Sequence, residues 1–372
     1  MTLEELIRDA VSLGMVSREA GEEYDRKFQT IVDFVDSELD AYQSIDALIG
    51  RNPRSMMYDN HAYHALFMAN VFKSNQFELL ARLVPWVYRA YHSHGFSYDY
   101  FPVELSSWKR AVEENLIDKG ASHIIAIYDW MIAHHSQMIE LSLDAKDPQT
   151  AVPGKWTDIR RAMLECLIEG NAKGALDLSR RSVKTKSDLK EFYLQVIQPS
   201  LCDVGTLWEK GDVSVAEEHL ATSIIGRVMA SFYASLFDVK PSKGVVVVTA
   251  APNELHEVGA RMVADFFEID GWDTRYLGAN TPIADLKSFL SNNTCNILVI
   301  SVAMPFNLDK AQEALDMVRG DPLLRKIRVL IGGRVFNDFP ELRKSLRSDG
   351  WASDAEGVIE VADRWYREGV FA

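Results

Sequence analysis

Residues 244–259 read GVVVVTAAPNELHEVG, and this stretch decides the fold of the last third of the chain. It opens with a run of β-branched residues, which is typical of a strand buried on both faces of a parallel sheet. A polar loop with Glu254 and His256 follows and leads into an amphipathic helical pattern over 258–268. A buried strand that is followed so soon by a helix predicts the first unit of an α/β sheet.

Strand-like and helix-like segments continue to alternate to the end of the chain. This alternation is typical of a parallel sheet covered by helices on both faces. The expected order is a strand over 244–250, a helix over 258–268, a strand over 274–277, a helix over 283–291, a strand over 296–302, a helix over 308–318, a strand over 328–331, a short strand near Trp351 and a helix over 355–368. We therefore predict a doubly wound, Rossmann-like parallel sheet over residues 243–372.

Two helical regions precede the predicted sheet. Residues 1–148 show helical periodicity throughout and predict an N-terminal all-helical sensor domain, for which a globin-like arrangement is one option. Residues 155–238 show the same period with breaks, and they predict a four-helix cap domain. The chain is thus expected to be a multidomain α and α/β protein.

Composition and charge narrow the class of protein. Of 372 residues, 47% are apolar and 25% are charged, as in ordinary globular proteins. The net charge is −14 and no basic stripe is present, so we expect no direct binding of nucleic acid. No apolar run is long enough to cross a bilayer, the N-terminus is unlike a secretory leader, and three cysteines are no disulfide framework. These features predict a cytoplasmic protein without membrane contact.

Small and polar residues follow several of the predicted strands. In a doubly wound sheet, ligands bind beyond the carboxyl ends of the strands. His256 is placed there to bind a metal, and Glu254 is the nearby acceptor for its other ring nitrogen. The pattern Glu-x-His-x-x-Gly is short, and an ordinary loop pair is the alternative. A ligand groove is favoured because small residues recur at successive strand ends. These residues are Gly259, Ser301, Gly332 and Gly333.

A second signature lies in the predicted cap. Trp208 is followed ten residues later by Glu218-His219, within LWEKGDVSVAEEHLAT. Part of this stretch starts a helix, because Ser214 and Glu217 have the spacing of a capping box. The capping box does not explain Trp208 or His219. A core tryptophan remains the alternative for Trp208.

Residues from about 155 to 372 resemble the cobalamin-binding module of methionine synthase and its relatives, a helical cap followed by a Rossmann-like domain. That family carries Asp or Glu-x-His-x-x-Gly, then Ser-x-x, then Gly-Gly, in the order found here. The resemblance implies that His256 is the lower axial ligand of cobalt and that Glu254 is its hydrogen-bond partner. It also implies that Ser301, Gly332 and Gly333 line the channel for the displaced dimethylbenzimidazole tail.

The signature in the cap is similar to that of the CarH-type cobalamin photoreceptors, where Trp-x9-Glu-His encloses the adenosyl group of adenosylcobalamin. The resemblance implies that Trp208, Glu218 and His219 cover this group. Glu209 departs from the pattern, because those photoreceptors carry a histidine after the tryptophan that can bind cobalt after photolysis. A bis-histidine photoproduct is therefore in doubt. Their N-terminal DNA-binding domain also has no counterpart in this sequence.

The N-terminal region is rich in histidine and aromatic residues, notably in PWVYRAYHSHGFSYDYF. Histidine and arginine can meet the nitrogens and propionates of a tetrapyrrole while aromatic residues pack against its ring. The candidate residues are His61, His64, Arg89, His92 and Tyr98. The alternative is a helical dimerisation domain with an aromatic core and surface histidines.

The domain order resembles that of the photocobilins, which are photoreceptors that hold biliverdin beside cobalamin. This resemblance implies a biliverdin in residues 1–148, with heme as the competing tetrapyrrole. No cysteine precedes Cys166, so a bilin in this domain would be held without a thioether bond.

These resemblances imply a light sensor rather than an enzyme. Light would cleave the cobalt–carbon bond of adenosylcobalamin, and the cap would shift. We expect a homo-oligomer whose size depends on light, or altered contacts with a downstream signalling protein. The alternative is a corrinoid protein that carries methyl groups between the subunits of a methyltransferase.

Overall fold

The computed structural model describes every residue except 118–119, 144–153, 237–239, 345 and 372. The chain divides into two compact units. The first holds Met1–Gln149 together with the segment Glu209–Asp212, and the second holds Thr150–Trp208 and Val213–Ala372. The predicted boundary near residue 148 lies outside the described residues.

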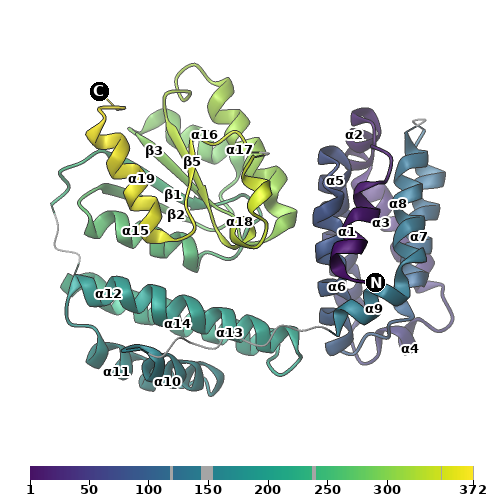
Figure 1. The fold of residues 1–372 in the computed structure, drawn as a ribbon, viewed down its shortest axis with the longest axis horizontal. Coiled ribbons are helices and arrows are strands. Elements are labelled where there is room, and N and C mark those ends of the chain that lie inside the picture. Colours follow the sequence, from purple (N-terminus) through teal and green to yellow (C-terminus); the bar gives the residue numbers. More distant parts are fainter. Residues whose placement is uncertain (118–119, 144–153, 237–239, 345, 372) are drawn as a thin grey trace. The chain divides into compact units, whose positions relative to one another are not determined.

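The first unit is helical, as the sequence predicts (Figure 1). Its elements are α1 (Leu3–Val11), α2 (Arg18–Arg26), α3 (Phe28–Asp40), α4 (Ile45–Ile49), α5 (Arg54–Ser74), α6 (Phe77–Ser93), α7 (Tyr100–Asn115), α8 (Ala121–Ala133) and α9 (His135–Ser142). Large aromatic side chains fill the core, among them Tyr24, Tyr100 and Trp108, none of which is exposed.

The second unit begins with the four-helix cap that the sequence predicts. Its elements are α10 (Thr157–Ile168), α11 (Ala172–Ser182), α12 (Lys186–Phe192), which continues through the π-helical turn η1 (Tyr193–Ile197) into α13 (Gln198–Glu209), and α14 (Val215–Leu236). The predicted capping box starts α14. The Ser214 amide donates to the Glu217 carboxylate at 2.7 Å, and the Glu217 amide donates to Ser214 Oγ at 3.3 Å.

Five parallel strands form the sheet of the second unit. They are β1 (Val245–Ala250), β2 (Asp273–Gly278), β3 (Ile297–Ser301), β4 (Arg328–Gly332) and β5 (Gly350–Trp351), in the spatial order β2-β1-β3-β4-β5. The chain moves outward from β1 to β2 and then returns past β1 to β3. The point where the order reverses is therefore between β1 and β3, where doubly wound sheets bind ligands. The predicted fold class is confirmed.

Helices cover the sheet, and one of them also contacts the cap. α15 (Val258–Ile269) packs beside α19 (Ala355–Arg367), and α16 (Ile283–Asn292) packs beside α17 (Leu308–Gly320). The short elements η2 (Pro305–Asn307), α18 (Arg334–Asp338) and η3 (Pro340–Lys344) complete the unit. Phe266 of α15 belongs to the same hydrophobic core as Phe192 and Phe232 of the cap. The cap and the sheet thus share one core.

The register of the strands brings the predicted small residues to one edge. Ala250 at the end of β1 lies beside Ser301 at the end of β3, which lies beside Gly332 at the end of β4. Gly333 then adopts a φ of +112°, and a Cβ atom there would overlap the carbonyl oxygen of Val302. Only glycine fits this close approach between the two loops.

Two further expectations from the sequence can be compared with the structure. Cys166, Cys202 and Cys295 are free thiols. Within the described residues, none of the helices combines the length and the apolar character that a bilayer span requires.

Candidate functional site

Glu254 is the centre of the loop between β1 and α15. Its side chain is 1% exposed. One carboxylate oxygen accepts hydrogen bonds from the His256 amide at 3.1 Å and from His256 Nδ1 at 2.6 Å. The other accepts from the amides of Ala303 and Met304 and from Asn307 Nδ2, each at 2.9 Å. This one side chain therefore joins the loop after β1 to the loop after β3.

The hydrogen bonds keep this buried carboxylate ionised. Burial alone raises the pKa of Glu254, but the hydrogen bonds from His256, Asn307 and Met304 and the charge of His256 outweigh it and lower the pKa to about 2. The hydrogen bond to Glu254 in turn raises the pKa of His256, while burial of the ring opposes this effect. Glu254 is thus an anion, and its hydrogen bond holds the imidazole of His256 in one orientation.

The orientation of His256 suits a metal ligand. Because Nδ1 donates to an ionised carboxylate, the lone pair of the neutral ring is on Nε2. The His256 side chain is 59% exposed, so this nitrogen can meet a ligand. Among the described residues, no three His, Cys, Asp or Glu side chains gather as a metal site. A cobalt ion inside a corrin ring would fit this donor set, because it would need only one imidazole from the protein, which His256 would supply.

The predicted small residues lie next to this loop. A Cβ atom on Gly259 would be 3.9 Å from Ser301 Oγ, so the opening turn of α15 faces the end of β3. Ser301 is 8% exposed, and its strand neighbour is Gly332. The structure therefore brings Gly259, Ser301, Gly332 and Gly333 together around one edge of the sheet, as the sequence predicts.

The cap brings a second charged group to the same site. Glu218, near the start of α14, is one of the charges that raise the pKa of His256, and Arg334 is one that lowers it. The Glu218 side chain is 31% exposed and accepts from Thr222 Oγ1 at 3.1 Å. His219 is 75% exposed, and its Nε2 lies 3.6 Å from the Glu218 carboxylate. Trp208 is partly buried near the end of α13.

Glu209 has a partner of its own. It belongs to the segment Glu209–Asp212, which groups with the first unit. Its carboxylate lies 3.6 Å from the guanidinium of Arg89, and its carbonyl oxygen accepts from Ser93 Oγ at 2.6 Å. The residue that departs from the photoreceptor pattern, and Arg89 from the predicted tetrapyrrole set, are therefore paired with each other.

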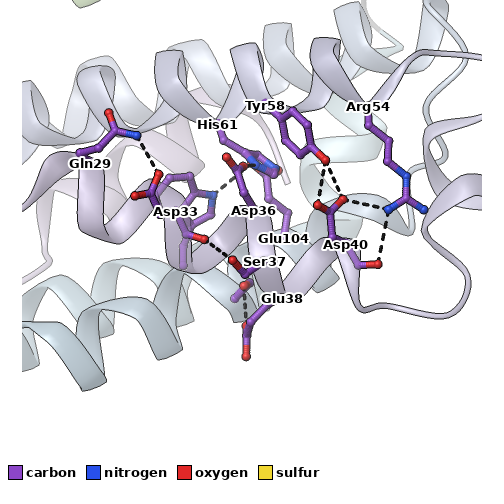
Figure 2. A network of polar contacts seen from close by, with 12 residues as sticks. Gln29, Asp33, Asp36, Ser37, Glu38, Asp40, Arg54, Tyr58, His61 and Glu104 are labelled. Atoms are coloured by element: carbon purple, nitrogen blue, oxygen red, sulfur yellow. Dashed lines mark hydrogen bonds and ion pairs between the residues drawn. The ribbon is translucent and has the colours of Figure 1, made fainter.

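His61 lies in the polar core of the first unit (Figure 2). Its Nδ1 is 2.5 Å from the Asp36 carboxylate and its Nε2 is 2.7 Å from the hydroxyl of Tyr100. The ring is completely buried, and both nitrogens are engaged. Glu104, 3% exposed, accepts from the indole of Trp108 beside it. His61 is therefore not one of the surface histidines of the dimerisation alternative, and its predicted role in tetrapyrrole binding stays a prediction.

His64, one turn further along α5, belongs to the same aromatic core. Its ring stacks on Trp108 at 4.8 Å, and Nε2 is 3.3 Å from the hydroxyl of Tyr128. Burial, with a smaller effect of the charge on His61, lowers the pKa of His64 to about 3. The imidazole of His64 is therefore neutral at physiological pH.

His92 and Tyr98 form a second group near the end of α6. Their rings stack at 4.0 Å, and the Tyr98 hydroxyl is 3.0 Å from Ser142 Oγ. Stacked rings continue from Tyr98 to Tyr88 at 6.3 Å and from Tyr88 to Phe101 at 3.7 Å. Of the five predicted tetrapyrrole residues, His61 and His64 thus lie in the aromatic core, His92 and Tyr98 form a second group in which His92 is exposed, and Arg89 pairs with Glu209. The chromophore assignment stays a prediction.

The sequence did not reveal the three donors from the loop after β3. Ala303 and Met304 act through backbone amides, which have no residue signature. Asn307 has one, because an amide side chain just before a helix can reach a neighbouring loop, but the sequence does not say which loop that is. Arg334, directly after Gly332-Gly333, was also missed.

Comparisons with known proteins agree with this geometry. Residues 159–232 and residues 244–360 each match a family model described as a B12 binding domain. The chain therefore contains a cobalamin-binding module that runs from the cap through the sheet.

The similar proteins include corrinoid proteins and one repressor. A corrinoid protein of Desulfitobacterium hafniense (strain Y51) is 20% identical over 208 residues, which are 54% of this chain and 94% of that protein. The HTH-type transcriptional repressor CarH of Myxococcus xanthus is 27% identical over 139 residues, which are 37% of this chain and 46% of that protein. The solved structure of the monomethylamine corrinoid protein of Methanosarcina barkeri is 16% identical and superposes with a TM-score of 0.48. The matched region is 56% of this chain and 98% of the solved chain.

Replacing Glu254 by glutamine should lower the free energy of unfolding at pH 7 by about 3 kcal/mol, because the folded state keeps this carboxylate ionised far below its ordinary pKa. The original protein should lose this contribution as the pH falls from 4.5 towards 2, and the variant should not. Urea unfolding at pH 7 and pH 3, followed by circular dichroism, measures both. Glu257→Gln, an exposed neighbour, is the control. An equal acid sensitivity of Glu254→Gln and the original chain would contradict this role.

Proposed function

We propose that this protein is a cytoplasmic photoreceptor that uses adenosylcobalamin and has no catalytic activity of its own. The observation that carries the proposal is the pattern Trp208-x9-Glu218-His219 in the cap, of which the Glu218 charge helps to raise the pKa of His256. The similarity to CarH over 139 residues supports it further. Adenosylcobalamin, when bound, supplies a cobalt–carbon bond that visible light can break.

The residues of the module would divide the work between two faces of the cofactor. His256 would bind cobalt from below, and Glu254 would hold the imidazole in one tautomer and one orientation. Ser301, Gly332 and Gly333 would leave room for the nucleotide tail at the strand ends. Trp208, Glu218 and His219 would cover the adenosyl group from above.

The signal would be a movement of the cap. The adenosyl group would fill the space between the cap and His256 in the dark, and its departure would remove the contacts that hold the cap closed. A ligand shifts a two-state element only as far as it binds the two states differently. Cap opening would then change the size of a homo-oligomer or the contacts with a signalling protein.

The first unit would hold a second chromophore. Non-covalent biliverdin is the tetrapyrrole that we propose for the core around His61, His64, Arg89, His92 and Tyr98, with heme as the competitor. The stack of the exposed His92 ring on the partly buried Tyr98 ring supports the proposal, since this pair is open to a further planar group. Biliverdin would extend the absorbed range into the red.

A second candidate function is supported by the curated relatives. Corrinoid proteins are the majority of the similar proteins named, including the dimethylamine corrinoid protein 3 of Methanosarcina acetivorans at 19% identity over 183 residues. In this case His256 would again bind cobalt, and the cofactor would carry a methyl group between methyltransferase subunits. The small methyl group would leave Trp208 and His219 without a ligand contact.

Light should distinguish the two functions. The full chain, reconstituted with adenosylcobalamin in the dark, should change both its absorption spectrum and its size-exclusion profile after green light, because the cap would lose its upper contact. The methylcobalamin form is the control for the size of the upper ligand. If the size-exclusion profile of the adenosylcobalamin form does not change on illumination, the photoreceptor function is contradicted. Methyl transfer to a thiol or corrinoid acceptor would support the carrier.

His256→Ala should abolish the absorption features of histidine-bound cobalamin and weaken binding at least tenfold, because it removes the Nε2 lone pair. His219→Ala is the matched control. It removes an exposed imidazole on the opposite side and should leave the lower-ligand spectrum unchanged. Titration with hydroxocobalamin measures both. Unchanged binding by His256→Ala would refute the assignment of the ligand.

Expression of the full chain with biliverdin should give a red or far-red absorption band that denaturation in acidified methanol removes from the protein. His92→Ala should shift or abolish this band, because the exposed imidazole lies against Tyr98. His219→Ala should not change it. A protein that forms no such band would disprove biliverdin binding, and a Soret band with added heme would favour the competitor.

A further inference from the structure

Two tyrosine–carboxylate contacts join the cap to α15, and they differ in burial. The Tyr193 hydroxyl donates to Asp265 Oδ2 at 2.7 Å, and both residues are buried, with exposures of 0% and 8%. The Tyr233 hydroxyl donates to Glu268 Oε1 at 2.8 Å, and this tyrosine is 56% exposed. The chain thus carries a buried contact and a matched exposed contact on the same helix.

The buried contact lies where the backbone of the cap departs from regular geometry. Tyr193 is the first residue of η1, the π-helical turn between α12 and α13. Such turns are rare in proteins, and those that occur often lie at functional sites. α13 then leads to Trp208, whereas Asp265 lies on the helix that follows the His256 loop. The contact therefore connects the two halves of the candidate cobalamin site.

We propose that Tyr193 and Asp265 are a positioning pair, which fixes the cap on α15 and links closure of the cap to the uptake of one proton by Asp265. This proposal rests on the cap movement of the proposed function. Neither residue is a ligand of the cofactor. The pair acts on the cofactor site only through the position of α13 and α15.

The surroundings of Asp265 make its carboxyl sensitive to pH. Burial raises its pKa to about 6, although the hydrogen bond from Tyr193 and the charge of Arg261 oppose this shift. Glu268 on the same helix adds to the shift. The hydroxyls of Tyr233 in the cap and Tyr276 on β2 also face this region, and their own raised pKa values keep both neutral here.

The direction in which pH changes cap closure follows from the difference in the pKa of Asp265 between the closed and the open cap. In an open cap, water would restore the ordinary pKa of 3.8, so the closed cap binds the proton more tightly. Closure should therefore be favoured as the pH falls, by about tenfold between pH 7.5 and pH 5. At pH 7.5 the ionised carboxylate gives the cap its greatest freedom to open.

Hydrogen–deuterium exchange of the full chain without cofactor tests the pair. Peptides over 186–197 and 258–269 should be about tenfold better protected at pH 5 than at pH 7.5, after correction for intrinsic exchange. Asp265→Asn should be protected equally at both pH values, because asparagine imitates the protonated acid. Tyr193→Phe should keep the dependence but move its midpoint to higher pH, since the hydrogen bond lowers the pKa of Asp265.

Glu268→Gln is the matched comparison, because it removes the exposed contact on the same helix. It should keep the pH dependence and move its midpoint to lower pH, opposite to Tyr193→Phe, since the charge of Glu268 raises the pKa of Asp265. Protection that is independent of pH in the original chain, or a dependence that persists in Asp265→Asn, would overturn the proposal. A midpoint that stays in place in Tyr193→Phe would also overturn it. If the exchange follows these expectations but the protein does not respond to light, the photoreceptor function is refuted and the positioning pair is not.

Discussion

The site depends on one buried carboxylate. Glu254 accepts two hydrogen bonds from His256 and three from the loop after β3, and it does so across the point where the strand order reverses. Without these donors an ionised side chain could not remain at 1% exposure. The same contacts fix the ring of His256 and the path of both loops, so the orientation of the proposed cobalt ligand and the stability of the strand ends have a common origin.

The fold was largely predictable, because local patterns and tertiary structure agree in the second unit. The β-branched run before Glu254 became β1, and the remaining strands and helices follow in the expected order. The small residues Ser301, Gly332 and Gly333 also met as expected, since parallel strands bring their carboxyl ends to one edge.

The polar contacts of the candidate site and of the first unit were not predictable, because no local sequence pattern encodes them. The amides of Ala303 and Met304 hold Glu254, yet any residue could supply them. In the first unit, the spacing of histidines indicated ligands or surface residues, whereas His61 is a buried core residue between Asp36 and Tyr100. A helical period shows which residues share a face, but it does not show which partner a polar side chain on that face will find.

Electron paramagnetic resonance of bound cobalamin in its Co(II) state tests the central claim most directly. The full chain would be prepared with natural histidine and with nitrogen-15 histidine. If Nε2 of His256 binds cobalt, labelling should change the superhyperfine lines from triplets to doublets, because the two isotopes differ in nuclear spin. Triplets that persist in the labelled protein would contradict the account, since the ligand would then be the dimethylbenzimidazole of the cofactor.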